Sequence, residues 1–584
     1  MYSRKSHGFS SIRYKVVALI LLVIMVITLA RLLYLTMIDR AFLLNKGLQE
    51  ANHPRVIPAN RGVLFDRNGV PLAVSAPLDN VIFDAKVLSQ HPEDWHILSD
   101  SPLLGLSRGQ VIGLIMTDPN SRHVIARKNL PPAQADAVDN LNVPGVYIER
   151  NHQSFYPEGP ALAQLVGFTD VNDNGQDGLE LAYNNFLAPI YGKQSVTESA
   201  LGQTYSINQL IKAAKDGHDL YLSVDSRIQY VAYQALATQV QKIGADWGAV
   251  AVLNPHTGEV IAAVSYPSYN PNSIAARSGT GVKNQAITDQ IEPGSTMKPI
   301  TITAALQSGQ YTPDTPIDTN PGFYMLDGHK IRDDANFGLI NVTGVITASS
   351  NVGVSKIALS LPRKQLYDMF LNYGIGTKPS GGKFPGEASG FIYPLKVLGD
   401  FQFATMAFGY SVTASAIQMA RLYSAIANDG VLLPVSYVKL DKPPEGTRII
   451  SEKTAKEMLN ILKTVPNPNI PHATGILANV PGYIVAGKTG TAHMVNPQGG
   501  YYSNKMNALF AGIIPANNPQ LVIVVMISDP QGYYNGFGGV SAAPVFAQIA
   551  LAAMHILGIS PSTDKVDLDL FKDQQKFYKQ LVEA

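Results

Sequence analysis

One stretch of eight residues decides how the rest of the chain is interpreted: Glu292-Pro293-Gly294-Ser295-Thr296-Met297-Lys298-Pro299. Pro293 and Gly294 end a loop, and an apolar run over residues 300–306 continues as a predicted helix. Proline is tolerated in the first turn of a helix but not in its interior, so Pro299 places Ser295 at the helix start. Residues three apart share a helix face, so we expect the Lys298 Nζ to reach the Ser295 Oγ.

This placement suits nucleophilic catalysis. A serine hydroxyl is a poor nucleophile and needs a neighbouring base. A lysine that is buried near other cations loses its proton near neutral pH and can serve as that base. The helix N-terminus also offers backbone N–H groups to a developing oxyanion. The alternative is an ordinary helix start, with a capping serine and an exposed lysine.

The Ser-x-x-Lys pattern occurs twice more, so the pattern alone is weak. Ser380 and Lys383 enclose two glycines, which disfavour a stable helical turn. Ser562 and Lys565 lie in a polar C-terminal tail where no pocket is expected. The context therefore favours Ser295 as the nucleophile.

A second motif, Ser-x-Asn, occurs three times, at Ser206, Ser268 and Ser349. Only Ser349 and Asn351 fall between Ser295 and the single Lys-Thr-Gly of the chain. They lie in a run that is predicted to be helical, residues 345–359, so their polar groups could face a cleft.

The third motif, Lys488-Thr489-Gly490-Thr491, directly follows a predicted strand over residues 483–486. A strand edge that carries hydroxyls and a cation suits an extended peptide with a terminal carboxylate. We expect Gly490 to let the substrate approach the backbone closely.

Composition bounds the possible functions. The chain has 584 residues, which favours two or more domains. Its net charge is +1, and nothing in it points to nucleic acid. The absence of cysteine excludes disulfides, thiolate catalysis and cysteine metal sites. No metal or other cofactor is expected.

The N-terminus predicts a membrane anchor. Four basic residues precede an apolar segment over residues 16–38, which is long enough to span a bilayer as a helix. The alternative, a cleaved signal peptide, is disfavoured by the length of the run and by the lack of a cleavage pattern. The charge distribution places residues 1–15 in the cytoplasm and the bulk of the chain outside. Arg31 within the span either contacts another membrane protein or extends to the headgroups.

The rest of the chain divides into four parts. Residues 39–60 are predicted as a juxtamembrane helix and linker, and residues 61–225 as a unit rich in turns. Asp66-Arg67-Asn68-Gly69 predicts a tight turn. Asn172-Asp173-Asn174-Gly175 lacks the full calcium-loop pattern and also predicts a turn. Residues 559–584 form the polar tail.

Residues 226–558 predict an antiparallel sheet with helices packed on it, an α+β fold. A strand over 218–225 leads into this segment, a turn over 254–258 joins its first two strands, and a long helical region follows from 295 into the 420s. The other predicted elements are helices over 226–243 and 542–557 and strands over 248–253, 260–264, 483–486, 508–514 and 521–527.

The ordered triple of Ser-x-x-Lys, Ser-x-Asn and Lys-Thr-Gly resembles the active-site signature of penicillin-binding proteins and serine β-lactamases. The spacing of the motifs resembles that of class B penicillin-binding proteins. The likeness covers roughly residues 10–558. It is also carried by Arg61-Gly62-Val63-Leu64-Phe65-Asp66-Arg67-Asn68-Gly69, Arg150, Tyr156-Pro157-Glu158-Gly159, Gly175-x-x-Gly178-x-Glu180 and residues 267–272.

Within class B, Ser349-Ser350-Asn351 is similar to the division type (FtsI-like, septal), because elongation-type members typically carry Ser-Cys-Asp there. The resemblance implies a transmembrane helix, an elongated β-rich pedestal (dimerisation-like) domain over 61–225, and a transpeptidase domain over 226–558. That last domain would combine a sheet between helices with an all-helical subdomain, like serine β-lactamases.

The resemblance also implies roles. Ser295 would attack the D-Ala-D-Ala bond of a peptidoglycan stem peptide, with Lys298 as base. Ser349 and Lys488 would relay a proton to the leaving group, and Asn351 would orient the peptide and Lys298. Thr489 and Thr491 would hold the terminal carboxylate, and the backbone N–H groups of Ser295 and Thr491 would form the oxyanion hole. No catalytic role is expected for His493.

The implied partners are stem peptides, β-lactams that acylate Ser295, a SEDS-type (FtsW-like) glycosyltransferase in the membrane, contacted through Arg31 and the pedestal, and other division proteins. The implied location is the cytoplasmic membrane at the division septum, with the catalytic domain in the periplasm. Rival functions are a β-lactamase, a penicillin sensor, a carboxypeptidase and a silent scaffold. The anchor and the long pedestal count against the first, the single span against the second and the intact motifs against the last.

Overall fold

The computed structural model describes residues 11–150, 152–198, 204–279 and 281–561. The chain forms two compact units. Both are discontinuous in sequence. Unit 1 holds residues 1–60, 77–151 and 189–217, and unit 2 holds 61–76, 152–188 and 218–584.

Unit 1 begins with the predicted membrane helix. Helix α1 (Ser11–Leu33) runs into a π-helical turn (Tyr34–Ile38), and α2 (Arg40–Ala51) follows. The segment Ile12–Ile38 has a mean hydropathy of 3.0, and its most apolar stretch is not buried against the rest of the protein. It therefore has the length and apolar character of a single membrane span. Within it, the Arg31 guanidinium lies 5.3 Å from the centre of the Tyr34 ring.

Two small antiparallel sheets complete unit 1. In the first, β4 (Asp79–Phe83) lies between β5 (Val124–Leu130) and β6 (Val146–Glu149). Its apolar residues pack with those of α4 (Trp95–Asp100), α5 (Arg108–Thr117) and α6 (Pro132–Asp139) around one core. The second sheet has the order β1-β8-β9, with bounds Asn52–Ile57, Gly192–Glu198 and Thr204–Lys212.

Unit 2 starts with the predicted turn at residues 66–69, which joins β2 (Leu64–Phe65) to β3 (Pro71–Pro77). The Asp66 carboxylate accepts hydrogen bonds from the backbone of Asn68 and Val70, and from Ser226 at the start of α10. Arg61 pairs with Glu180, and both side chains are buried. The motifs over residues 61–69 and 175–180 are therefore held within unit 2 by hydrogen bonds and an ion pair. The predicted turn at 172–175 is also confirmed, closed by a bridge between Thr169 and Gly175.

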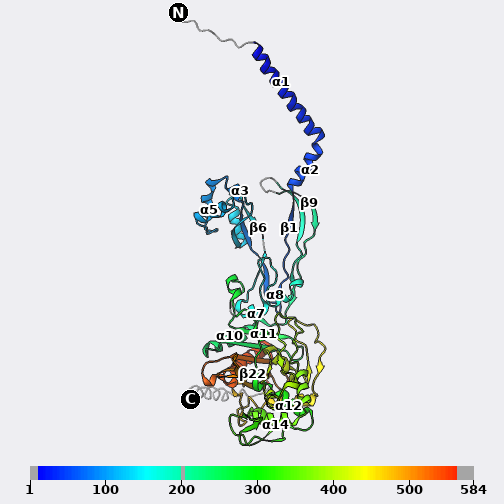
Figure 1. Ribbon diagram of the computed structural model, residues 1–584, viewed down its shortest axis with the longest axis vertical. Coiled ribbons are helices and arrows are strands. Elements are labelled where there is room, and N and C mark those ends of the chain that lie inside the picture. The colour runs from blue at the N-terminus through cyan, green and yellow to red at the C-terminus, as the bar shows by residue number, and fades with distance from the viewer. Residues whose placement is uncertain (1–10, 151, 199–203, 280, 562–584) are drawn as a thin grey trace. The chain divides into compact units, whose positions relative to one another are not determined.

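The main sheet of unit 2 is antiparallel and has the order β12-β11-β23-β22-β21, of which β22 is labelled in Figure 1. Apolar residues on its two faces belong to two separate cores. Helices α10 (Ser226–Lys242) and α19 (Gly538–Ile556) cover one face, and α12 (Lys298–Gln307) and α17 (Ala416–Ala427) cover the other. The prediction of a sheet between helices is confirmed. The strand bounds are Trp247–Leu253 (β11), Val260–Tyr266 (β12), Ala486–Val495 (β21), Tyr501–Ile514 (β22) and Leu521–Ser528 (β23).

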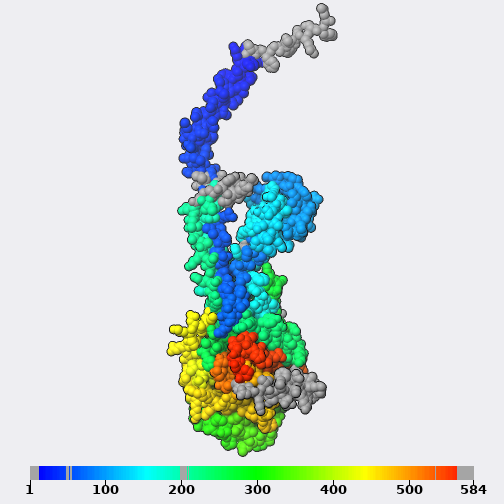
Figure 2. Space-filling view, turned by 180° about the vertical axis from the view of Figure 1, so that it is seen from behind, coloured from blue at the N-terminus to red at the C-terminus, as the bar shows by residue number. Residues whose placement is uncertain are grey.

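The helices of unit 2 follow the prediction at both ends of the segment. Helix α10 spans Ser226–Lys242, and α19 spans Gly538–Ile556 and contributes much of the orange and red surface in Figure 2. Between them, the sequence predicts one long helical region from residue 295 into the 420s. That region contains α12 (Lys298–Gln307), α13 (Val342–Thr347), α14 (Asn351–Ser360), α15 (Arg363–Asn372), α16 (Asp400–Met406) and α17 (Ala416–Ala427), and α18 (Glu452–Leu462) follows it.

Short strand pairs interrupt that region, which corrects the prediction. Strand β14 (Phe323–Leu326) pairs with β15 (His329–Arg332), β13 (Pro316–Asp318) with β16 (Leu339–Asn341), and β17 (Phe391–Ile392) with β18 (Val412–Thr413). These hairpins are mostly exposed, so they lack the alternating apolar pattern that marks a half-buried strand.

Two strands of the main sheet also begin elsewhere than predicted. Strand β21 begins at Ala486, where the predicted strand ended, so the Lys-Thr-Gly motif lies within the strand rather than after it. Strand β22 begins at Tyr501 instead of residue 508. Its first half is largely exposed, and only the buried half is hydrophobic enough to be recognised from sequence.

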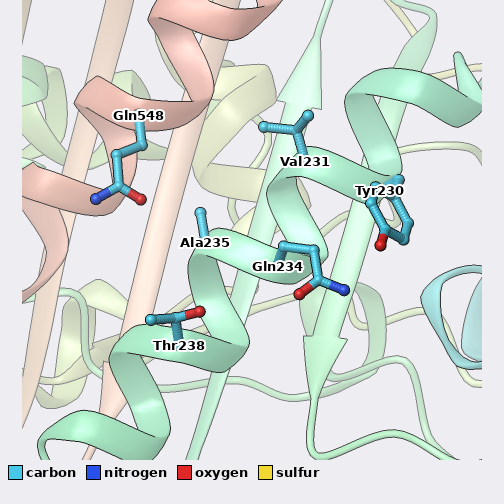
Figure 3. A pocket seen from close by; sticks show the side chains of 6 residues that line it. All are labelled: Tyr230, Val231, Gln234, Ala235, Thr238 and Gln548. Atoms are coloured by element: carbon cyan, nitrogen blue, oxygen red, sulfur yellow. The ribbon is translucent and has the colours of Figure 1, made fainter.

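A shallow apolar groove of about 270 Å³ lies on the outer side of α10 (Figure 3). Its walls contain none of the predicted site residues. They are Tyr230, Val231, Gln234, Ala235, Thr238 and Gln548.

Candidate active site

Ser295 lies in a short 3-10 turn, Gly294–Met297, that leads directly into α12. The predicted helix start is therefore confirmed, and Pro299 lies in the first turn of α12. The turn is held by Thr296, whose Oγ1 donates to the Pro293 carbonyl at 2.7 Å and whose own carbonyl accepts from the Tyr423 hydroxyl at 2.8 Å. The Ser295 side chain is half-buried.

Lys298 is completely buried, and its Nζ is directed at Ser349. It donates to the Ser349 carbonyl and, at 3.1 Å, to the Ser349 Oγ. Among the described residues no hydrogen bond joins it to the Ser295 Oγ, so the reach of Lys298 to Ser295 stays a prediction. Burial lowers the pKa of Lys298 to about 7, against the opposing charges of Asp333 and Asp334.

Ser349 lies between two lysines. Lys488 is also completely buried, and its Nζ donates to the Ser349 Oγ at 2.9 Å. Burial, followed by the charge of Lys298, holds the pKa of Lys488 well below its usual range. Two amines this close do not both stay protonated near neutral pH, so the pair can accept and release a proton through one hydroxyl.

The Lys-Thr-Gly strand runs past the Ser295 turn. Lys488 and Gly490 are two residues apart in β21 and so share one face of the strand. A Cβ at Gly490 would lie 2.8 Å from the Pro293 carbonyl oxygen and 2.8 Å from Thr296 Cγ2. The missing side chain therefore makes room for the turn that holds Ser295, and a close approach of substrate at Gly490 stays a prediction.

Thr489 and Thr491 occupy the alternate positions of the same strand. The Thr489 Oγ1 lies 2.8 Å from the Thr474 Oγ1, and the Thr491 Oγ1 accepts from the Gly538 backbone N–H at 3.3 Å. Thr489 is buried and Thr491 is half-buried. Their hydroxyls are therefore held in place by the protein, as a carboxylate-binding pair would need to be.

Asn351 is the first residue of helix α14. Its Nδ2 donates to the Arg332 carbonyl at 3.0 Å. Its backbone N–H donates to Asp333, which also accepts from Ser350 and Val352. The structure thus brings Ser349 to Lys298 and Lys488, but it gives Asn351 no hydrogen bond to Lys298 among the described residues.

Sequence reasoning missed Asp333 and also Glu292. The Glu292 Oε1 accepts from the Ser411 backbone N–H at 2.8 Å and from the Tyr501 hydroxyl at 3.1 Å. Burial raises the pKa of this carboxyl. An acid immediately before the Pro-Gly of the first motif was visible in the sequence, but its partners are more than a hundred residues away.

The remaining candidate residues lie apart from the cluster around Ser349 or outside the described residues. Ser380 bonds to Glu387 within a turn, with its Oγ 2.7 Å from Oε2, and is not at a helix start. Ser562 and Lys565 lie outside the described residues. His493 is half-buried, and its Nδ1 lies 3.0 Å from the Tyr502 carbonyl oxygen, beyond the motif in β21.

Comparison with protein families gives two matches. Residues 248–551 match the penicillin binding protein transpeptidase domain, and residues 56–222 match the penicillin-binding protein dimerisation domain. The chain is 33% identical to the peptidoglycan D,D-transpeptidase FtsI of Escherichia coli, over 95% of this chain and 93% of that protein. It is 36% identical to the probable peptidoglycan D,D-transpeptidase PenA of Neisseria meningitidis, over 91% of both chains.

Solved structures agree with this. A peptidoglycan synthetase from Bifidobacterium adolescentis superposes with a TM-score of 0.69 at 25% identity, covering 88% of this chain and 98% of that one. Penicillin-binding protein 3 of Mycobacterium tuberculosis, solved with aztreonam, gives a TM-score of 0.67 at 26% identity, over 87% and 98% of the two chains.

Proposed function

The chain belongs to the class B penicillin-binding proteins, as a peptidoglycan D,D-transpeptidase of the FtsI type, and we propose that it works through an acyl-enzyme on Ser295 during septal wall synthesis. One observation carries the assignment of the site: the amines of Lys298 and Lys488 both donate to the Ser349 Oγ. These residues come from the three sequence motifs, and the fold assembles them beside the turn that holds Ser295.

In the first half of the reaction, the Ser295 Oγ bonds to the carbonyl carbon of the D-Ala-D-Ala peptide bond. Lys298, in its neutral form, takes the hydroxyl proton, because burial makes that form available near pH 7. The backbone N–H groups of Ser295 and Thr491 bind the oxyanion. The C–N bond then breaks, and a proton that passes through Ser349 from the lysine pair reaches the departing D-Ala amine.

In the second half, the amine of a neighbouring stem peptide attacks the ester and releases Ser295 with its proton restored. Thr489 and Thr491 hold the terminal carboxylate of the donor peptide, and Asn351 contacts the peptide backbone. A β-lactam enters at the first step, because its strained amide is attacked by Ser295 and its amine remains tethered to the acyl group.

The experiment that tests this assignment uses labelled penicillin on the full chain and on Ser295→Ala. The wild type is expected to carry one covalent label per chain and Ser295→Ala none, with the same thermal unfolding midpoint. Covalent labelling of Ser295→Ala would contradict the assignment. Ser380→Ala is the matched control, since its serine also belongs to a Ser-x-x-Lys, and it should label like the wild type.

We extend the proposal to the cell. The apolar stretch over residues 16–38, within the helical segment Ile12–Ile38, anchors the chain in the cytoplasmic membrane. Residues 1–15 remain in the cytoplasm, and the transpeptidase region over 226–558 and the pedestal over 61–225 lie in the periplasm. A SEDS-type (FtsW-like) glycosyltransferase and other division proteins are the proposed partners. Depletion should give filaments without septa, and a fluorescent fusion should gather at midcell. Growth of round cells on depletion would contradict the septal role.

A further inference from the structure

The hairpin β14–β15 ends against the second motif, and Asp333 makes the contact. This residue directly follows β15 and is partly buried. Its Oδ2 accepts from the Ser350 hydroxyl at 2.6 Å. Its Oδ1 accepts from the backbone N–H groups of Asn351 at 2.5 Å and Val352 at 2.9 Å. One carboxylate therefore satisfies two of the free N–H groups that open helix α14.

The residue before this cap is Ser349, which has a backbone φ of 59°. A residue other than glycine is strained in this left-handed region and stays there only when its surroundings hold it. On one side Ser349 is tied to the end of α13, where its N–H donates to the Ile346 carbonyl. On the other side α14 begins, with Ser350 as its N-cap, donating to Asp333 and accepting from Gly353.

We propose that Asp333 is a positioning residue for acylation: its carboxylate fixes the first turn of α14 and thereby holds the Ser349 hydroxyl between Lys298 and Lys488. This inference rests on the proposed roles of Ser295, Lys298 and Ser349. Asp333 touches none of the atoms that react. It acts through the peptide that links Ser349 to the capped helix.

The Asp333 carboxylate also acts on the lysines through its charge. The neighbouring Asp334 allows this charge effect to be tested apart from the positioning of α14. Two acidic residues act on the buried lysines: Asp333 and Asp334 favour the protonated form of Lys298, and Asp334 also favours that of Lys488, which Lys298 disfavours. Asp334 is exposed and has no side-chain hydrogen bond in the described residues. It therefore supplies charge without the cap.

Three variants of the full chain in detergent micelles resolve the two effects: Asp333→Glu, Asp334→Asn and Asp333→Asn. For each, the acylation rate constant and the Kd of the non-covalent penicillin complex are measured from pH 5.5 to 9. Asp333→Glu keeps the charge but moves the carboxylate by one methylene. It should acylate about 30-fold more slowly, with Kd within about threefold of wild type and an unshifted pH profile.

Asp334→Asn should show the reverse: its maximal rate should be unchanged, and the acid limb of its profile should move to lower pH because Lys298 loses its proton more readily. Asp333→Asn should show both effects. The proposal is overturned if Asp333→Glu acylates within about threefold of wild type. It is also overturned if weaker non-covalent binding, seen as a higher Kd, accounts for the whole loss of acylation. The proposal is also overturned if neither Asp333 variant shows a cooperative thermal unfolding transition, since Asp333 would then be needed for the fold itself.

A wild-type chain that penicillin does not label at Ser295 would refute the proposed function itself, which is a separate outcome from any difference among these variants.

Discussion

At the scale of single residues, the site depends on two amines placed where amines are costly. Lys298 and Lys488 are fully buried and meet at one hydroxyl. A buried ammonium loses most of its hydration, so the folded protein favours the neutral form of at least one of them. The burial that makes Lys298 a base therefore also makes the folded state less stable than it would be with an apolar residue at this position.

Lys298→Met should abolish acylation and stabilise the fold. Below pH 7 Lys298 is protonated in both states, and the folded protein bears the full cost of burying the charge. As pH rises from about 7 towards about 10.4, only the unfolded chain keeps its proton, so the free energy of unfolding of the wild type rises. We expect the variant to gain about 1–4 kcal/mol at pH 7 and less at pH 10.

Chemical denaturation of both proteins at the two pH values measures this difference. A variant that is less stable than wild type at pH 7 would mean that Lys298 is held as a charged structural group. Lys356→Met is the control, because that lysine donates to the Asp318 carbonyl outside the site and its replacement should not affect acylation.

At the scale of secondary structure elements, the sequence predicted the strands that are continuously apolar and missed those that are polar or exposed. The strands around residues 250, 262 and 524 were identified because their residues are continuously apolar. Strand β21 was displaced because it carries Lys488, Thr489 and Gly490, whose polarity hides the strand. The hairpin β14–β15, which Asp333 directly follows, was missed because its two strands are only four residues long and mostly exposed, and with it the contact to α14.

Gly490→Ala tests the close packing of β21 on the Ser295 turn. The added methyl would lie 2.8 Å from two atoms of Pro293 and Thr296, so strand and turn must move apart. We expect a loss of about 1–3 kcal/mol in unfolding free energy and at least a tenfold slower acylation. Gly113→Ala is the control, since a Cβ there meets nothing within 4 Å. Unchanged acylation in Gly490→Ala would show that the turn tolerates displacement.

Tyr501→Phe tests how β22 is fastened to the loop before Ser295. The Tyr501 hydroxyl donates to Glu292; burial raises the pKa of this carboxyl, and the bond from Tyr501 opposes that rise in part. Its removal should cost about 1 kcal/mol of unfolding free energy at pH 7, measured by denaturant titration. Tyr230→Phe, on the exposed side of α10, should cost almost nothing. Equal effects of the two substitutions would rule out a role for this bond.

At the scale of the whole molecule, the order of parts was readable from the sequence. The apolar run, the turn-rich segment and the three motifs each carry a local signal. The division into two discontinuous units was not readable, because it depends on which segments return to the same unit: residues 61–76 and 152–188 belong with the transpeptidase region. Contacts between segments so far apart leave no periodicity in the chain.

Removal of residues 1–38 should release the protein from the membrane without loss of the site. The apolar stretch of the segment Ile12–Ile38 is not buried against the rest of the protein, and every predicted catalytic residue lies in unit 2. We expect a chain starting at residue 39 to leave the membrane fraction and to acylate within about twofold of the full chain. Retention in carbonate-washed membranes would show that another segment also binds lipid.

The central claim is that Ser295 is the residue acylated. The most direct measurement is intact mass and peptide mapping of the wild-type chain after reaction with penicillin. The account predicts one adduct per chain, on the peptide that contains Ser295 and on that side chain alone. An adduct on any other residue, or a folded full-length chain that gains no mass, would contradict it.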